Sequence, residues 1–544
     1  MCHFPTTKTD EEVKPLPEEE HDADMESEEE PGEENEESAP SARIWSEIQQ
    51  KNADAALLMF VIRSFQHMSI VDCLKPLMAT NENYVLPDRQ DIMERILPHM
   101  YSVCFNEQKA NMQEAVKVCL SIEEWVTSKG ESISSITGHY VNSNFELKSV
   151  LLKCCEFQAY NIEEAATFLR ELCNEWDIFS KVHGCLTNRQ HNFNRALNSL
   201  GWNQFKCTAF ALNVILQKSL EISKPILEKV KKIAHHFLWD TKSMTMLNDY
   251  QRNVQGLEDP IEIMDSNIVH WSATYDMVEI FLSLQQALTA VVNEISSLEF
   301  TNEDWSKLNQ LFKLYKPFSD ATKELGDDKY VCGSTVIPIV HSLKTSLQEM
   351  DNDPNFILVK EEINCMMQEL NTEYEGVERE LNLAMSTILD PRYKMSKFVD
   401  GNAAEAAKTH LVTEIQNLMN VNNTTDAMKT ESAEEKQEQG NSVNTENSLV
   451  LAQEEMDLYI EDDLAACDPS EWWPNNQQKY PHLAQLFKAK CSIVATSLLG
   501  GNLYTERGNN LCENRQRLSA NKARYMVFLR ANLKDEDDFL KVMP

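Results

Sequence analysis

The 544-residue sequence predicts an α+β protein that is mostly helical, in which a five-stranded mixed sheet is interrupted by a large all-α insertion and followed by a C-terminal helical segment. Three observations predict this class. Three β-branched and apolar runs follow one another between residues 115 and 160, separated by short turn signals. Short strands then alternate with amphipathic helices up to residue 220. Finally, residues 222–420 are almost entirely helical in pattern and too numerous for a loop.

The elements are expected in the following order. A helical domain at 44–111 contains one helix over Trp45–Met68 and another that starts at Pro87. The runs AVKVCLSIEEW, SISSITGHYV and FELKSVLLKCCEF form an antiparallel meander. After them come a helix, a strand, a helix and a strand, at 162–176, 181–186, 192–200 and 205–209.

This β-β-β-α-β-α-β order, followed by a further helix, is typical of a ribonuclease-H-like layout. Its first part is expected at 112–221, the all-α insertion at 222–420, and the segment that completes it at 471–544.

The charge of the chain is strongly negative and unevenly distributed. The formal net charge is −37. Residues 1–43 hold 16 acidic residues against three basic ones, and residues 421–471 hold 14 against two. Both blocks are poor in aromatic and β-branched residues, which predicts a disordered acidic tail at 1–43 and a disordered acidic linker at 421–470. Such blocks are usually only solvated, but they can also attract basic partners such as histones.

Composition excludes several classes of protein. The sequence has no apolar run of about 18 residues, and its first 30 residues are acidic, so we expect neither a membrane partner nor a secretory leader. Its 14 cysteines form no Cys-x2-Cys pair and no zinc-finger spacing. We therefore expect free thiols in a reducing compartment, with no cofactor and no structural metal.

Several separated stretches resemble the hAT superfamily of cut-and-paste DNA transposases, including the host proteins derived from them that carry BED-type zinc fingers. The most specific are WW-x6-YPHLAQLFKAKCSIVATS at 472–497 and GNNLCENRQRLSANKARYMVFLRANL at 508–533. Further matches are HWSATYDM at 270–277, STVIPIV at 334–340 and STILDPRYK at 386–394. The resemblance covers residues 45–534, and the BED-finger motif is absent from this sequence.

The resemblance implies a catalytic site in which three carboxylates hold two divalent metals about 4 Å apart. Glu123 stands at the first carboxylate position, where the family has the shorter aspartate. Asn188 and Gly501 stand at the second and third, so both charges are lost. We therefore expect a ribonuclease-H-like fold whose catalytic carboxylates are replaced and which is not an enzyme. An active transposase or nuclease is the rival hypothesis.

Basic and aromatic residues provide candidates for DNA contacts. Lys229, Lys231 and Lys232 could neutralise backbone phosphates, although a solvated helix face also explains them. The resemblance implies that Trp271 is a platform on which a displaced base stacks; burial in the helical insertion is the alternative. Arg515 and Arg517 are further candidates, and here the alternative is a charged surface.

The resemblance also implies that the closing segment supports dimerisation. Candidate anchors, for which core packing is the alternative, are Trp472, Trp473, Tyr480, Pro481 and Leu483. The predicted function is that of a catalytically inactive, transposase-derived protein of the nucleus. We expect a homodimer or higher oligomer that works with DNA or chromatin proteins in transcription. A protein-binding scaffold without nucleic-acid contact, nuclear or cytoplasmic, is the alternative.

Overall fold

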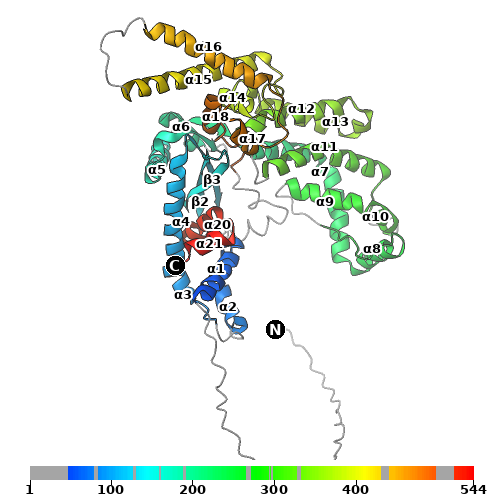
Figure 1. Cartoon of the computed structure of the whole chain (residues 1–544). Coiled ribbons are helices and arrows are strands. Elements are labelled where there is room, and N and C mark those ends of the chain that lie inside the picture. Colours follow the sequence, from blue (N-terminus) through cyan, green and yellow to red (C-terminus); the bar gives the residue numbers. More distant parts are fainter. Residues whose placement is uncertain are drawn as a thin grey trace, which may run out of the picture.

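Figure 1 shows the computed structural model of the chain, which describes most residues between 47 and 544. The described ranges are 47–78, 84–126, 130–157, 161–187, 191–264, 271–292, 295, 298–326, 332–429, 440–497 and 520–544.

The sheet has five strands, in agreement with the sequence prediction. They are β1 (Val118–Val126), β2 (Ser132–Val141), β3 (Leu147–Glu156), β4 (Val182–Thr187) and β5 (Asn203–Lys206). Their spatial order is β3-β2-β1-β4-β5. The three-strand meander is antiparallel, while β4 runs parallel to both β1 and β5. The fifth strand was expected at 205–209 but ends at Lys206, because a long helix already begins at Thr208.

The helices of the sheet domain come from both ends of the described chain and from between the strands. They are α1 (Glu47–Arg63), α2 (Ser69–Met78), α3 (Arg89–Asp91), η1 (Ile92–Ile96), α4 (Leu97–Asn111), η2 (Met112–Glu114), α5 (Ile162–Glu175), η3 (Phe179–Lys181), α6 (His191–Leu200), α20 (Ala520–Asn532) and α21 (Glu536–Val542). The first helix stops short of the expected Met68, because Phe65 adopts a positive φ of 49° and turns inward.

These helices and the sheet share one hydrophobic core, which joins residues as distant as Leu58, Leu120 and Phe528. Residues 44–111 were expected as a domain of their own, but the described helices between 47 and 111 share the core of the sheet domain.

A helical arm extends to one side of the sheet (Figure 1). It contains α7 (Thr208–Trp239), α8 (Thr241–Asn253), α9 (Trp271–Ser283), α10 (Gln285–Val292), α11 (Asn302–Gly326), η4 (Gly333–Thr335), α12 (Val336–Asn352), η5 (Pro354–Val359) and α13 (Lys360–Glu373). A second core, with Phe237, Leu308 and Phe318 fully buried, holds the arm together. The boundary expected between 221 and 222 falls inside α7, because this helix continues without a break from the sheet into the arm.

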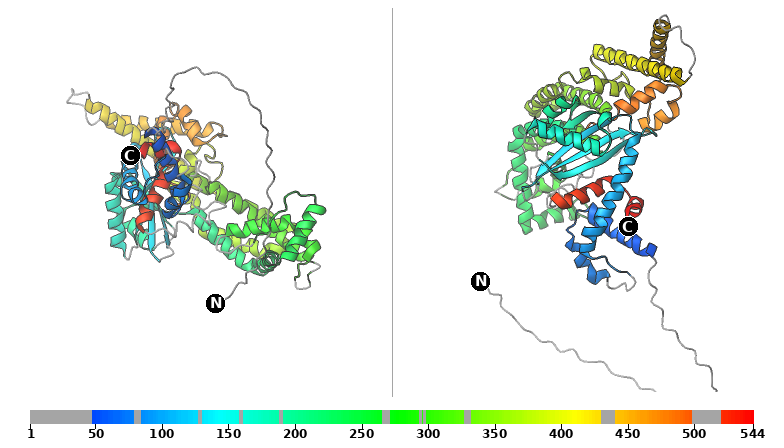
Figure 2. Two further views of the ribbon diagram at one scale, coloured as in Figure 1. Left: turned by 90° about the horizontal axis from the view of Figure 1, so that it is seen from below. Right: turned by 90° about the vertical axis from the view of Figure 1, so that its left-hand side faces the viewer.

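The third group of helices surrounds a separate core at the base of the arm. It comprises η6 (Val377–Arg379), α14 (Leu381–Leu389), α15 (Gly401–Lys429), α16 (Gly440–Glu461), α17 (Pro469–Asn476) and α18 (Pro481–Lys490). Helices α15 and α16 form a hairpin at the opposite end of the molecule from α1 and α2, as both Figure 1 and Figure 2 show.

The prediction of a disordered linker at 421–470 is thus wrong for the described part of α16. Ala452, Met456 and Tyr459 follow a helical spacing and are fully buried, so this acidic segment has an apolar face that packs. Among the described residues, none of the helices is both long and apolar enough to cross a membrane.

Candidate functional site

One face of the sheet carries polar side chains where a core would be apolar. Register pairs β1 with β2 as Ser121 with Thr137 and Glu123 with Ser135, and paired residues point to the same face. His139 of β2 lies on this face as well and is opposite Ser149 of β3. Except for the half-buried Ser149, all of these side chains are buried. We call the set Ser121, Glu123, Ser135, Thr137, His139 and Ser149 the polar sheet face.

A chain of hydrogen bonds crosses three strands of the polar sheet face. The His139 Nε2 atom lies 2.8 Å from the Ser121 hydroxyl, and its Nδ1 atom lies 2.8 Å from the Ser149 hydroxyl. Burial lowers the pKa of His139 to about 3, because an imidazolium would have to leave water. The ring is therefore neutral at physiological pH, donating one hydrogen bond and accepting the other.

Glu123 is the one carboxylate of the polar sheet face. It lies toward the C-terminal end of β1 and is 5% exposed, and the Ser135 hydroxyl is 3.5 Å from its backbone carbonyl oxygen. Glu124 points to the other face, where it accepts a hydrogen bond of 3.2 Å from Ser134. A magnesium pair requires several anionic oxygen ligands. Within the polar sheet face, the other side chains are hydroxyls and a neutral imidazole, and none of them supplies a second anionic oxygen.

The other positions implied by the resemblance lie outside the described residues. Asn188 would follow β4 directly, and Gly501, Arg515 and Arg517 fall within 498–519. In the ranges that the structure does describe, no three His, Cys, Asp or Glu side chains are placed to hold a metal ion.

The segment 491–497 connects the sheet with both helical groups. The amide of Thr208 donates to the Ala495 carbonyl at 2.8 Å, and the amide of Gly333 donates to the Ile493 carbonyl at 2.6 Å. A Cβ atom on Gly333 would lie 2.9 Å from Ile493, so a side chain does not fit here. On the other side, Ile493 and Val494 share a buried cluster with Cys119 and Leu186 of the sheet, so the segment is held between sheet and arm.

The DNA-contact candidates of the arm are engaged within the protein. The ammonium group of Lys229 forms an ion pair of 2.7 Å with Asp304. On the same helix, Lys231 is half-buried and Lys232 is exposed, and both make interactions of their own.

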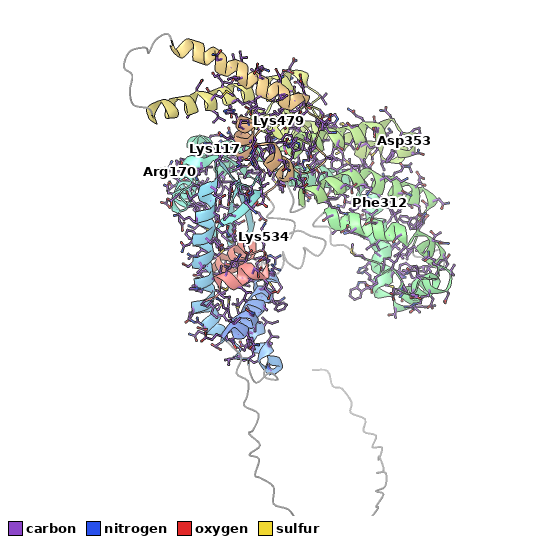
Figure 3. The ribbon with its side chains drawn as sticks, in the orientation of Figure 1. Lys117, Arg170, Phe312, Asp353, Lys479 and Lys534 are labelled. Carbon is purple, nitrogen blue, oxygen red and sulfur yellow. The ribbon has the colours of Figure 1, made fainter. Side chains whose placement is uncertain are left out.

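Trp271 is only 8% exposed and contacts Tyr275 edge-on, with ring centroids 6.3 Å apart. Tyr275 in turn stacks on Phe312, which Figure 3 labels on the arm. The structure therefore favours burial over base stacking for Trp271.

Most of the dimerisation candidates lie inside the third core. Trp473, Tyr480 and Leu483 are fully buried, Trp472 is half-buried, and Pro481 is exposed. The ring of Trp472 stacks on Tyr480 at 6.0 Å, and the ring of Trp473 stacks on Tyr459 of α16 at 5.7 Å. The burial of Trp473, Tyr480 and Leu483 favours the alternative of core packing, because their apolar surface is already covered within the chain.

The sequence motif LDPRYK has a clear structural position that its pattern alone did not reveal. Asp390 is fully buried and forms an ion pair of 2.8 Å with Arg392, which also reaches Asp468 at 3.1 Å. Lys394 donates to the carbonyl oxygens of Tyr459 and Asp462 at 2.6 and 2.5 Å. The motif thus ties the base of the arm to the end of α16.

Comparison with known families gives two matches. Residues 205–314 match the ZBED1 RNase-like helical domain, which here covers β5 and the first part of the arm. Residues 453–533 match the hAT family C-terminal dimerisation region, which includes α17, α18 and α20.

Two curated relatives are similar over most of this chain. The human zinc finger BED domain-containing protein 4 is 21% identical over 498 residues, which is 85% of this chain and 41% of the relative. The zinc finger BED domain-containing protein DAYSLEEPER of Arabidopsis thaliana is 21% identical over 464 residues, 76% of this chain and 65% of the relative. The chain therefore spans less than two thirds of either relative. Sheet order, motifs and both family matches agree in making this chain similar to the hAT superfamily of transposase-derived proteins.

Proposed function

We propose that this chain is a catalytically inactive, transposase-derived factor of the nucleus, which acts as a dimer in association with DNA or chromatin proteins. The observation that carries the proposal is the polar sheet face. Glu123 is the one carboxylate of that face, whose other members are hydroxyls and a neutral histidine. The replacement of the other two carboxylates by Asn188 and Gly501 in the sequence supports the same conclusion.

Self-association is supported by the match of residues 453–533 to a dimerisation region. Association with DNA or chromatin and a nuclear location rest on kinship with zinc finger BED proteins. Because the net charge is −37, direct DNA binding has to come from local basic surfaces and is expected to be weak and sensitive to salt.

Loss of cleavage is tested with the full chain and labelled duplex DNA in Mg²⁺ and in Mn²⁺. We expect no strand cleavage with either ion. The variant to compare is the triple substitution Glu123→Asp, Asn188→Asp, Gly501→Glu, which restores the three acidic residues that the resemblance implies. A gain of Mn²⁺ binding by this variant in calorimetry would support the proposal, whereas cleavage by the unmodified chain that Glu123→Ala abolishes would overturn it.

A scaffold without nucleic-acid contact is the second candidate, favoured by the burial of Trp271 and by the ion pair of Lys229. DNA binding by the full chain, measured at two salt concentrations, separates the two functions. Phosphate contacts require that log affinity falls linearly with log salt. Light-scattering mass of the same sample reports self-association; a monomer that binds no DNA would favour the scaffold.

A further inference from the structure

Helix α16 has a second apolar face in addition to the one buried in the third core. Four of its apolar side chains are about half exposed: Leu449 at 46%, Val450 at 56%, Leu451 at 54% and Leu458 at 46%. Ala452, Met456 and Tyr459 are fully buried on one side of the helix. Leu451 and Leu458 lie roughly a third of a turn away from them, whereas Leu449 lies next to Met456 around the axis. The hairpin that carries this face lies at the end of the molecule, away from the sheet and the arm (Figures 1 and 2).

Leucine and glutamate alternate along the exposed face at helical spacing. The order is Leu451, Glu454, Leu458 and Glu461, with intervals of three, four and three residues. This is the spacing of the seam of a two-stranded coiled coil. All four side chains are exposed, and we call them the α16 seam.

The alternation determines which partner fits. A second α16 packed in parallel would place Glu454 against Glu454 and Glu461 against Glu461. An antiparallel copy has two possible registers. In one, each leucine packs against a glutamate, and in the other the two Glu454 side chains meet. Like charges in contact, or a carboxylate covered by leucine, destabilise such a pair. A helix with leucine-type residues opposite Leu451 and Leu458, and with Lys or Arg opposite the glutamates, would bury the apolar surface and pair both charges.

We propose that the α16 seam is a docking surface for a basic amphipathic helix of another protein. Acidic side chains elsewhere on α16 already show this pairing within the chain. Asp457 is 2.6 Å from Lys408 of α15, and Glu455 is 2.8 Å from His482 of α18. Neither carboxylate belongs to the seam, so the charges of the seam remain directed outward.

The probe is a synthetic helical peptide of about three heptads, the length of α16, with leucine and lysine alternating at the seam positions. A peptide with glutamate in place of lysine is its counterpart. Fluorescence anisotropy with the full chain should show binding of the lysine peptide that weakens as salt rises. The double variant Leu451→Ser, Leu458→Ser should weaken this binding at least about tenfold, since each leucine buries apolar surface in the complex.

A charge exchange separates docking on the seam from general attraction to an acidic protein. The variant Glu454→Lys, Glu461→Lys should lose the lysine peptide and gain the glutamate peptide. The matched control changes an exposed apolar residue and an exposed acid on the arm, Val254→Ser with Glu258→Lys, and should leave binding unchanged. Equal far-UV circular dichroism of all variants establishes that each is folded.

Three results would overturn the proposal. The first is no binding of the lysine peptide below about millimolar concentration. The second is binding that neither seam variant alters, which would assign it to other acidic segments. The third is conversion of a dimer to a monomer by the leucine variant in light scattering, which would make the seam an interface between copies. None of these results bears on DNA cleavage. The third would support the dimer of the proposed function while overturning the docking proposal, so the two are distinguishable.

Discussion

His139 shows how a single buried side chain couples the stability of this protein to pH. Its two ring nitrogens join hydroxyls on either side, so the neutral form satisfies the site completely. Protonation would add a charge that burial does not tolerate, as the lowered pKa of about 3 indicates. His183 behaves similarly: its pKa is lowered to about 4, mainly by burial.

We predict that His139 makes the folded state less stable in acid. An unfolded histidine has a pKa of about 6.5, so its contribution is fully present above that pH and is lost as the pH falls toward 3. Between pH 7.5 and 5.5, urea unfolding of the natural chain should show a loss about 1.4 kcal/mol larger than that of His139→Asn. His410→Asn, an exposed change on α15, should behave like the natural chain. An equal loss in both histidine variants would contradict the prediction.

Asp390 is a fully buried carboxylate that forms an ion pair with Arg392 and accepts a hydrogen bond of 2.6 Å from the Ser334 hydroxyl. Removal of the guanidinium by Arg392→Ala would leave a fully buried carboxylate without its ion pair, which we expect to cost about 3–5 kcal/mol. Adding Asp390→Asn should recover much of the loss, because the buried charge is then gone. Arg379→Ala is the control, since Arg379 pairs with Asp400 at the surface and should cost about 1 kcal/mol or less. Unfolding in urea measures all three.

At the scale of elements, one side chain completes the edge of the sheet. Strand β3 is an outer strand. The amide side chain of Asn532, at the end of α20, accepts from the Leu151 backbone N–H at 2.9 Å and donates to the Leu151 carbonyl at 3.0 Å. It thus takes the place of a neighbouring strand and satisfies two backbone groups that would otherwise be buried without partners.

Asn532→Ala should therefore destabilise the sheet domain by about 2–4 kcal/mol, because a buried donor and a buried acceptor lose their partners together. The exposed Asn475→Ala, which loses one hydrogen bond to Glu471, should change the free energy of unfolding by about 0.5 kcal/mol or less. Hydrogen exchange of Leu151 gives a local readout. Protection of this amide in the Asn532 variant equal to that of the natural chain would refute the role assigned here.

Most helices and strands were predictable from the sequence. The meander and helix α16 show what decides whether such a prediction succeeds. The meander was found because β-branched runs and turn signals are local features. Helix α16 was missed because its composition is acidic, although the spacing of Ala452, Met456 and Tyr459 was available. The sequence could name Trp473 as a packing residue but could not decide whether it packs in the core or at an interface. That choice depends on contacts with Tyr459 and Phe487, which lie elsewhere in the sequence.

At the scale of the whole molecule, the described chain forms a sheet domain, a helical arm and a third helical group, each with its own core. The candidate site was predictable only through the resemblance. The motif identifies Glu123, whereas the placement of His139 and Ser149 on the same face follows from strand register, which no local pattern gives.

Because the cores are separate, a cavity in one core should destabilise the elements around that core and leave the other cores protected. Leu58→Ala in α1 and Leu308→Ala in α11 each remove a fully buried side chain and should cost about 2–5 kcal/mol. In hydrogen exchange, Leu58→Ala should expose α1, the sheet and α20 together, while Leu308→Ala should expose the arm alone. If Leu58→Ala affected only residues 47–111, these helices would be a domain of their own after all.

The pairing of Asn532 with Leu151 also bears on how the chain is made. The two residues are 381 positions apart. A ribosome that adds about 5–20 residues per second therefore produces Leu151 roughly 20–75 s before Asn532 emerges. Throughout that interval the nascent β3 presents an open strand edge, to which another chain could add. Until translation reaches α20, the newly made sheet depends on chaperones, or on its own slow folding, to avoid such pairing.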